Sequence, residues 1–278
     1  MKSNTKRIGR LFLRKTNLTP MDPDVIIDRP PGLFDDYDRI LVSVLFSWDV
    51  PRAEWLAAQW AAVCDVRIGG PAMGERGEQF EPGRFVRRGA VITSRGCPNR
   101  CWFCSVWRRE GGFVRELNIT EGYNVLDDNL FRCSDGHVQK VFAMLDRQRE
   151  RAEFTGGLEA RALTDYHVGL LADRRKRIKQ LFLAYDTPDD REPLQVAAKR
   201  LRDCGFTWNQ LRCYVLVGYP GDTMEKAESR LKETLNIGAF PMAMLYRNDR
   251  NETTRQWRSF QREWARPIYV YQKMKISA

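Results

Sequence analysis

Strand-like and helix-like segments alternate along most of this chain, and that alternation limits its fold more than any other feature. Short apolar runs that end in polar residues or glycine begin near residues 90, 123, 153, 180, 213 and 240. Between them lie stretches whose apolar spacing and capping residues are typical of helices. This order predicts a parallel sheet with helices outside, and six such units are too few to close an eight-stranded barrel. We therefore expect an α/β fold, an open partial (βα)6 TIM-like barrel over residues 84–247.

The N-terminal part shows a shorter version of the same alternation. An apolar run at 40–46 predicts a strand, an alanine-rich stretch at 52–63 predicts a helix, and 66–71 predicts a strand and a turn. Residues 1–38 are polar and rich in proline, so we expect few strands there. The chain then divides into an N-terminal lead-in with a small βαβ extension (1–83), the partial barrel (84–247) and a basic, aromatic C-terminal tail (248–278).

Three cysteines with C-x3-C-x2-C spacing follow the strand predicted at 90–93. Cys97, Cys101 and Cys104 would bring three thiolates into one small volume. A structural zinc site normally takes four protein ligands, so three cysteines leave an open position for a substrate or cofactor. Zinc with a distant fourth ligand, and reduced structural thiols, stay open as alternatives. The candidates for that fourth ligand are Cys64, Cys133, His137, Cys204 and Cys213.

Residues 93–104, with the aromatic Phe103 directly before the third cysteine, resemble the cluster loop of the radical S-adenosylmethionine (radical SAM) enzymes. The resemblance implies that Cys97, Cys101 and Cys104 hold a [4Fe-4S] cluster and that S-adenosylmethionine chelates the fourth iron. In that family one electron from the cluster cleaves S-adenosylmethionine to methionine and a 5′-deoxyadenosyl radical, which takes a hydrogen atom from the substrate. The reaction could then be a rearrangement, an elimination, an oxidation or C–C bond formation.

The same resemblance implies cofactor contacts at the ends of the predicted strands. The residues concerned are Phe103, Asp127, Asp128, Glu159, Arg161, Asp186 and Gly218. Asp127 or Asp128 would meet the methionine amino group, Arg161 would pair with its carboxylate, and Asp186 would accept hydrogen bonds from the ribose. Gly218 would let the backbone approach the adenosyl group. Each residue also has a purely structural alternative, as a turn former, a surface ion pair or a loop glycine.

Two features relate the chain to the cobalamin-binding and methylthiolation-type branch of that family. Asp127-Asp-Asn129 stands where many members have Gly-Gly-Glu, and the βαβ unit at 39–75 resembles the end of a cobalamin-binding domain. The unit is incomplete, however, and the only histidines, His137 and His167, both follow the cysteine loop. The sequence therefore argues against cobalamin, and its remaining cysteines lack the spacing of a second cluster.

The positive charge of the chain bears on its partners. The formal net charge is +10, with one basic stretch in residues 1–17 and another at 174–177. The tail adds Trp257, Phe260 and Trp264 on one helical face among arginines. Such surfaces suit a nucleic acid or a nucleotide as substrate, with a small metabolite or a peptide as the alternative. The tail face could equally pack against the barrel.

The sequence also gives expectations about the electron donor and the cellular location. Reduction of a cluster requires a one-electron donor, which the resemblance implies is flavodoxin- or ferredoxin-like. The chain has no apolar run long enough to cross a bilayer and no secretory signal, so we expect no membrane partner and a cytoplasmic location. A non-catalytic iron–sulfur or zinc module is the alternative to an enzyme. No residue that acts on the substrate itself can be named from the sequence.

Overall fold

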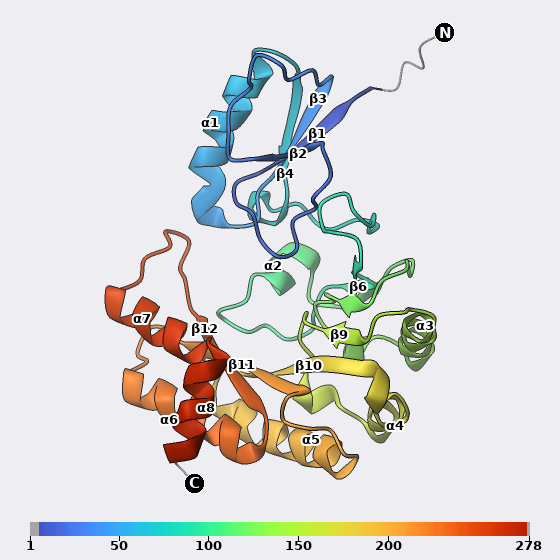
Figure 1. The fold of residues 1–278 in the computed structure, drawn as a ribbon, viewed down its shortest axis with the longest axis vertical. Helices are drawn as coiled ribbons and strands as arrows, with labels where there is room; N and C mark the ends of the chain where they lie inside the picture. The colour runs from blue at the N-terminus through green and yellow to red at the C-terminus, as the bar shows by residue number, and fades with distance from the viewer. Residues whose placement is uncertain (1–5, 277–278) are drawn as a thin grey trace.

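The described residues form two parallel sheets, joined by a segment over residues 70–89, and one small antiparallel sheet of two strands (Figure 1). The computed structural model describes residues 6–276, and side chains as far as residue 272. Residues 1–5 of the predicted lead-in and 277–278 of the predicted tail lie outside the described part. In Figure 1 the N-terminal sheet lies above, and helices α3 to α6 form an arc around the larger sheet below.

The larger sheet has six strands, all parallel and in sequential order. They are β5 (Ala90–Val91), β8 (Asn124–Val125), β9 (Ala152–Phe154), β10 (Ile178–Tyr185), β11 (Leu211–Val217) and β12 (Phe240–Leu245). The two end strands, β5 and β12, do not pair, so the sheet is open. This confirms an α/β protein with an open parallel sheet, and all six strands lie where the sequence predicts them.

The helices of this part follow the strands as expected from their end signals. They are α3 (Asp135–Asp146), α4 (Asp165–Asp173), α5 (Arg191–Asp203) and α6 (Met224–Ile237). Side chains of Ser134, Thr164 and Thr223 accept hydrogen bonds from backbone N–H groups in the first turns of α3, α4 and α6. One continuous apolar core joins these helices to the sheet. It includes the contact of Phe142 in α3 with Phe154 in β9.

The first crossover differs from the others because it carries the cysteines. After β5 the chain forms the short strand β6 (Ser94–Arg95), the cysteine loop, and the one-turn helix α2 (Val106–Glu110). Strand β7 (Arg115–Glu116) then returns antiparallel to β6. The cysteine loop is thus closed at its base by a two-stranded ribbon.

The N-terminal sheet is larger than the sequence indicated. Its strands, in the order β2-β1-β3-β4, are β1 (Ile8–Phe12), β2 (Val25–Ile27), β3 (Arg39–Ser43) and β4 (Asp65–Gly69). Helix α1 (Val50–Ala61) packs on it through Leu56 and Trp60. The predicted βαβ unit is confirmed, but the expectation of few strands in 1–38 is wrong. Strand β1 contains Gly9, where a Cβ would lie 2.5 Å from Ile40 Cδ1, so glycine allows the close approach that pairs β1 with β3.

The C-terminal tail folds onto the larger sheet as two helices, α7 (Arg255–Trp264) and α8 (Pro267–Ile276). Trp264 is only 1% exposed, and Trp257 and Phe260 pack against the same core. The aromatic face of the tail is therefore part of the packing. No helix within residues 6–276 is long and apolar enough to cross a membrane.

Candidate functional site

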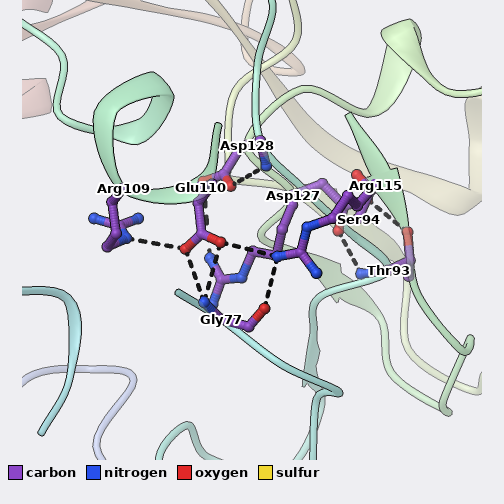
Figure 2. Close-up of polar contacts among 10 residues, drawn as sticks. Gly77, Thr93, Ser94, Arg109, Glu110, Arg115, Asp127 and Asp128 are labelled. Carbon is purple, nitrogen blue, oxygen red and sulfur yellow. Dashed lines mark hydrogen bonds and ion pairs between the residues drawn. The ribbon is translucent and has the colours of Figure 1, made fainter. Parts of the chain in front are cut away.

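The cysteine loop starts at the carboxyl end of β5, where a buried carboxylate holds it. Asp127, two residues beyond the end of β8, accepts hydrogen bonds from Thr93 N (2.6 Å), Thr93 Oγ1 (2.5 Å) and Ser94 Oγ (2.7 Å), as Figure 2 shows. The residue is 1% exposed, and burial raises the pKa of its carboxyl group although these hydrogen bonds act in the opposite direction. Asp127 therefore fixes the start of the loop.

His137 of α3 joins this hydrogen-bond network through Thr93. Its Nε2 lies 3.3 Å from Thr93 Oγ1, and its Nδ1 lies 3.6 Å from Glu116 Oε2 in β7. Because Thr93 donates its own hydroxyl proton to Asp127, its oxygen is free to accept from the histidine. His137 thus links α3 to the start of the cysteine loop and to β7.

Asp128 and Asn129, which follow Asp127, contact the loop itself. Asp128 Oδ2 accepts from Gly96 N at 2.8 Å, and its other oxygen lies 3.7 Å from Arg95 Nη1. Asn129 Nδ2 donates to Cys97 Sγ at 3.3 Å. Asn129 Oδ1 is buried and has no hydrogen-bond partner among the described residues. A buried acceptor without a donor is costly unless a ligand satisfies it.

Glu159, after β9, fixes the orientation of that asparagine. Its Oε2 accepts from Asn129 Nδ2 at 2.7 Å, so the amide nitrogen must face Glu159 and the oxygen must face away. Arg132 binds the same carboxylate through two hydrogen bonds, of 2.8 and 2.6 Å. Burial raises the pKa of Glu159, but the bonds from Arg132 and Asn129 outweigh it and leave that pKa below its ordinary value. The result is a chain of contacts from Arg132 through Glu159 and Asn129 to Cys97.

The three cysteines are partly buried, carry no disulfide and act electrostatically on one another. Burial, followed by the neighbouring Cys104 and Cys97, raises the pKa of the Cys101 thiol to about 11. Burial likewise raises the pKa of Cys104. Thiolates in such a group repel one another, and a bound cation or cationic cluster would relieve that repulsion.

The donor set bears on which metal group fits. Within residues 6–276, no three His, Cys, Asp or Glu side chains are grouped as ligands of one metal ion. Of the fourth ligands considered for zinc, His137 is bonded to Thr93, and Cys213 lies in the core at 0% exposed. A four-iron cluster binds each cysteine to a different iron, so its ligands need not converge on one point. Three soft thiolates and a hydrogen-bond donor at one sulfur fit that group.

A second buried carboxylate anchors the far side of the loop. Glu110, the last residue of α2, accepts from Arg109 Nε (2.9 Å), Arg115 Nη2 (3.1 Å) and Gly77 N (3.0 Å), as Figure 2 shows. Gly77 belongs to the segment that joins the two sheets. The helix after the cysteines is therefore tied both to β7 and to this joining segment.

The other predicted contacts are spread along the carboxyl ends of the strands. Phe103 lies edge-on to Trp102, with ring centroids 5.4 Å apart. Burial, and next the charge of Asp190, raise the pKa of Asp186 at the end of β10 to about 7. Asp186 also acts electrostatically on Cys101, so the two lie in the same region.

Arg161 is placed differently from the rest. Its Nη2 donates to Asp189 O at 2.5 Å and lies 3.4 Å from Asp190 Oδ1. Together with Arg191 and Glu192 it lines an open surface depression of about 690 Å³ at the start of α5. The structure gives Arg161 no direct contact with the cysteine loop.

Gly218, after β11, has a positive φ of 75°. A Cβ there would lie 2.8 Å from Leu245 Cδ1 and 3.0 Å from Trp257 Cδ2. The glycine therefore lets α7 pack across the end of β11, which is a structural reason for its presence. Its N–H donates to Asp222 Oδ2 at 2.8 Å.

Sequence reasoning missed several residues of this site. Arg132 and Glu110 gave no signal, because their roles depend on partners 27 and 33 residues away. Asn129 could have been singled out, since it follows two candidate carboxylates at a strand end. Comparison of the chain with protein-family models and with curated proteins found no match.

Proposed function

We propose that this protein is a radical SAM enzyme whose Cys97, Cys101 and Cys104 hold a [4Fe-4S] cluster. The observation that carries the proposal is the surroundings of Cys97. Three cysteines with the family spacing lie at the carboxyl end of an open parallel sheet, and Asn129 Nδ2 donates to Cys97 Sγ at 3.3 Å. Catalytic groups of such sheets gather at this end of the strands.

The cluster, when reduced, would supply the electron that cleaves S-adenosylmethionine, and the chain would hold the polar ends of that cofactor. An ammonium group needs acceptors, and Asn129 Oδ1 is a buried acceptor with no partner among the described residues. Asp128 adds a carboxylate oxygen whose nearest cation, Arg95, is 3.7 Å away. We assign the methionine amino group to these two residues in preference to Asp127, whose carboxylate is already bonded three times.

Of the other predicted residues, Asp186 would contact the cofactor and Glu159 would position Asn129. Asp186, with a pKa of about 7, could accept from a ribose hydroxyl when ionised and donate when protonated. Glu159 would act through Asn129 by fixing its amide. Arg161 is held by the Asp189 and Asp190 segment, so a contact with the carboxylate of the cofactor would require that segment to release it.

Cleavage of S-adenosylmethionine tests the proposal. Protein with reconstituted iron and sulfide, reduced with dithionite under anaerobic conditions, should convert S-adenosylmethionine to 5′-deoxyadenosine and methionine. Replacement of any of Cys97, Cys101 and Cys104 by alanine should abolish the conversion. Cys64→Ala and Cys204→Ala are matched controls and should retain it, since Cys64 lies in the N-terminal domain and Cys204 follows α5. Iron uptake without any 5′-deoxyadenosine would favour a non-catalytic module.

A further inference from the structure

An exposed tryptophan stands inside the cysteine loop. Trp102 lies between Cys101 and Phe103 and is 48% exposed. Its ring centroid is 5.4 Å from that of Phe103, 5.8 Å from that of Tyr219 and 5.5 Å from that of Tyr246. The interplanar angles are 90°, 71° and 50°, so none of these rings stacks on a face of the indole. A planar ligand could therefore stack on Trp102 with the neighbouring rings around its edge.

The neighbours of Trp102 are held in place by the fold. Tyr219 follows β11 and Tyr246 follows β12, so both lie at the carboxyl end of the sheet. Arg230 stands 5.1 Å from the Tyr219 ring and forms a buried ion pair with Asp222 at 2.8 Å. The aromatic group is thus supported by strand ends and a buried ion pair, which favours a preformed binding surface.

The segment after β12 continues this surface towards the N-terminal sheet. Arg247 lies 5.9 Å from the Trp48 ring, which in turn stacks on Phe46 with centroids 4.7 Å apart. Ser47 Oγ donates to Asp249 Oδ1 at 3.2 Å. The segment that follows β3 therefore contacts the segment that follows β12.

Some arginines of this basic chain form ion pairs with carboxylates, and others do not. The N-terminal arginines pair with aspartates: Arg7 with Asp24, Arg10 with Asp22 and Arg14 with Asp49. In the second basic stretch Arg174 pairs with Asp146, whereas Arg175 and Arg177 donate to backbone carbonyls. By contrast, no carboxylate within residues 6–276 forms an ion pair with Arg100 of the cysteine loop or with Arg247, whose guanidinium donates a hydrogen bond to Asn251 Oδ1. Lys2, part of the basic stretch noted in the sequence, lies outside the described residues.

We infer that Trp102, Tyr219 and Tyr246 bind the base of a phosphorylated nucleotide, and that Arg100 and Arg247 meet its phosphate. Aromatic rings that stack with bases beside arginines that contact phosphates are the usual basis of nucleotide and single-strand binding. The inference rests on the proposed function, because it names the substrate class for the same site. It moves the nucleotide contact from the tail helix, whose aromatic face is packed, to the rim of the cysteine loop.

Binding measurements on the full-length, cluster-loaded protein test this inference. The probe is a fluorescein-labelled single-stranded DNA oligonucleotide of mixed sequence, followed by anisotropy. Trp102→Ala and Tyr246→Ala should each weaken binding about 5- to 150-fold, the range expected for loss of one stacking contact. Trp102→Phe should recover most of the loss because it restores a ring. Arg247→Ala should weaken binding and lower the slope of log K against log salt by about 0.7, as expected for one lost phosphate contact on a single strand.

Two controls are matched to these variants. Trp55→Ala removes a tryptophan of similar exposure, 47%, from α1. Arg149→Ala removes an exposed arginine before the amino end of β9, whereas the cysteine loop lies at the carboxyl ends of the strands. Trp55→Ala should not weaken oligonucleotide binding through lost stacking, and Arg149→Ala should not weaken it through a lost phosphate contact. An abasic oligonucleotide of the same length should bind the wild type and Trp102→Ala equally.

Competition by unlabelled nucleoside monophosphates identifies the source of the base. Displacement of the probe by a monophosphate supports a free nucleotide, whereas binding of the oligonucleotide alone supports a nucleotide within a strand. Equal binding of wild type, Trp102→Ala and Tyr246→Ala, or equal binding of abasic and normal strands, would overturn the inference. Cleavage of S-adenosylmethionine, measured on the same samples, shows separately whether the proposed function holds.

Discussion

Asn129 Nδ2 lies 3.3 Å from Cys97 Sγ and 2.7 Å from Glu159 Oε2, so one amide group connects the cysteine loop to a carboxylate of the next strand end. Hydrogen bonds to the sulfurs of an iron–sulfur cluster stabilise its reduced, more negative state. This contact is therefore expected to influence both the proposed cluster and the S-adenosylmethionine proposed to bind beside it.

Asn129→Leu removes the donor to Cys97 and the unpartnered acceptor Oδ1 together. We expect the cluster to form, its reduction potential to fall, and the affinity for S-adenosylmethionine to drop roughly 10- to 100-fold through loss of a charge-assisted contact. Redox titration and equilibrium binding measure the two effects. Asn118→Leu, at an exposed asparagine, is the control, and an unchanged potential and affinity in Asn129→Leu would contradict the assignment.

Gly218→Ala should destabilise the protein more than Gly221→Ala. Both glycines have positive φ values, 75° and 84°, so both substitutions carry backbone strain of about 1–3 kcal/mol. Only at Gly218 would the new Cβ collide with Leu245 and Trp257, since nothing lies within 4 Å of the corresponding position at Gly221. Denaturant unfolding measures the difference. If neither Leu245→Ala nor Trp257→Ala reduces the cost of Gly218→Ala, the collision is not its cause.

Trp264→Ala should lower the free energy of unfolding by about 3–5 kcal/mol, the usual cost of truncating a buried tryptophan. Trp264 is 1% exposed, whereas Trp55 is 47% exposed and should cost much less when replaced by alanine. Thermal unfolding of the two variants provides the comparison. A loss of oligonucleotide binding in Trp264→Ala at unchanged stability would show that the tail helix contacts the ligand.

Asp186→Asn should stabilise the protein at neutral and alkaline pH. Burial and the charge of Asp190 raise the pKa of Asp186 from 3.8 to about 7, against the smaller opposing effects of Leu216 N–H and Arg230. Between these two pH values the folded state retains a proton that the unfolded state has released, so stability falls as pH rises. A rise in pKa of one unit corresponds to about 1.4 kcal/mol, so the rise from 3.8 to about 7 limits the gain to about 4 kcal/mol. Unfolding measured at several pH values should show this gain vanish in acid, and a gain independent of pH would contradict the raised pKa.

The large sheet could be predicted because each of its strands is an apolar run with a polar end, a signal contained within a few residues. Strand β1 could not, because Gly9 and Arg10 interrupt its apolar pattern and only the pairing with β3 and β2 stabilises it. Spacing along a helix predicted the aromatic face of the tail, but only the fold decides that Trp264 is buried.

The same distinction between local signals and long-range contacts applies to the site. The cysteine spacing could be recognised in the sequence alone, together with the strand ends that carry Asp128 and Asp186. The contact of Asn129 with Cys97 spans 32 residues, and that of Arg132 with Glu159 spans 27. Such contacts depend on the register of neighbouring strands, and no local pattern encodes them.

The most direct test of the central claim is electron paramagnetic resonance of the reduced, anaerobically reconstituted protein, recorded with and without S-adenosylmethionine and accompanied by metal analysis. We predict about four irons per chain, the signal of a reduced [4Fe-4S] cluster, and a change in that signal when the cofactor binds at the open iron. Loss of the signal in Cys97→Ala, Cys101→Ala and Cys104→Ala would tie it to the loop. Stoichiometric zinc without iron, or a cluster signal that S-adenosylmethionine leaves unchanged, would contradict the account.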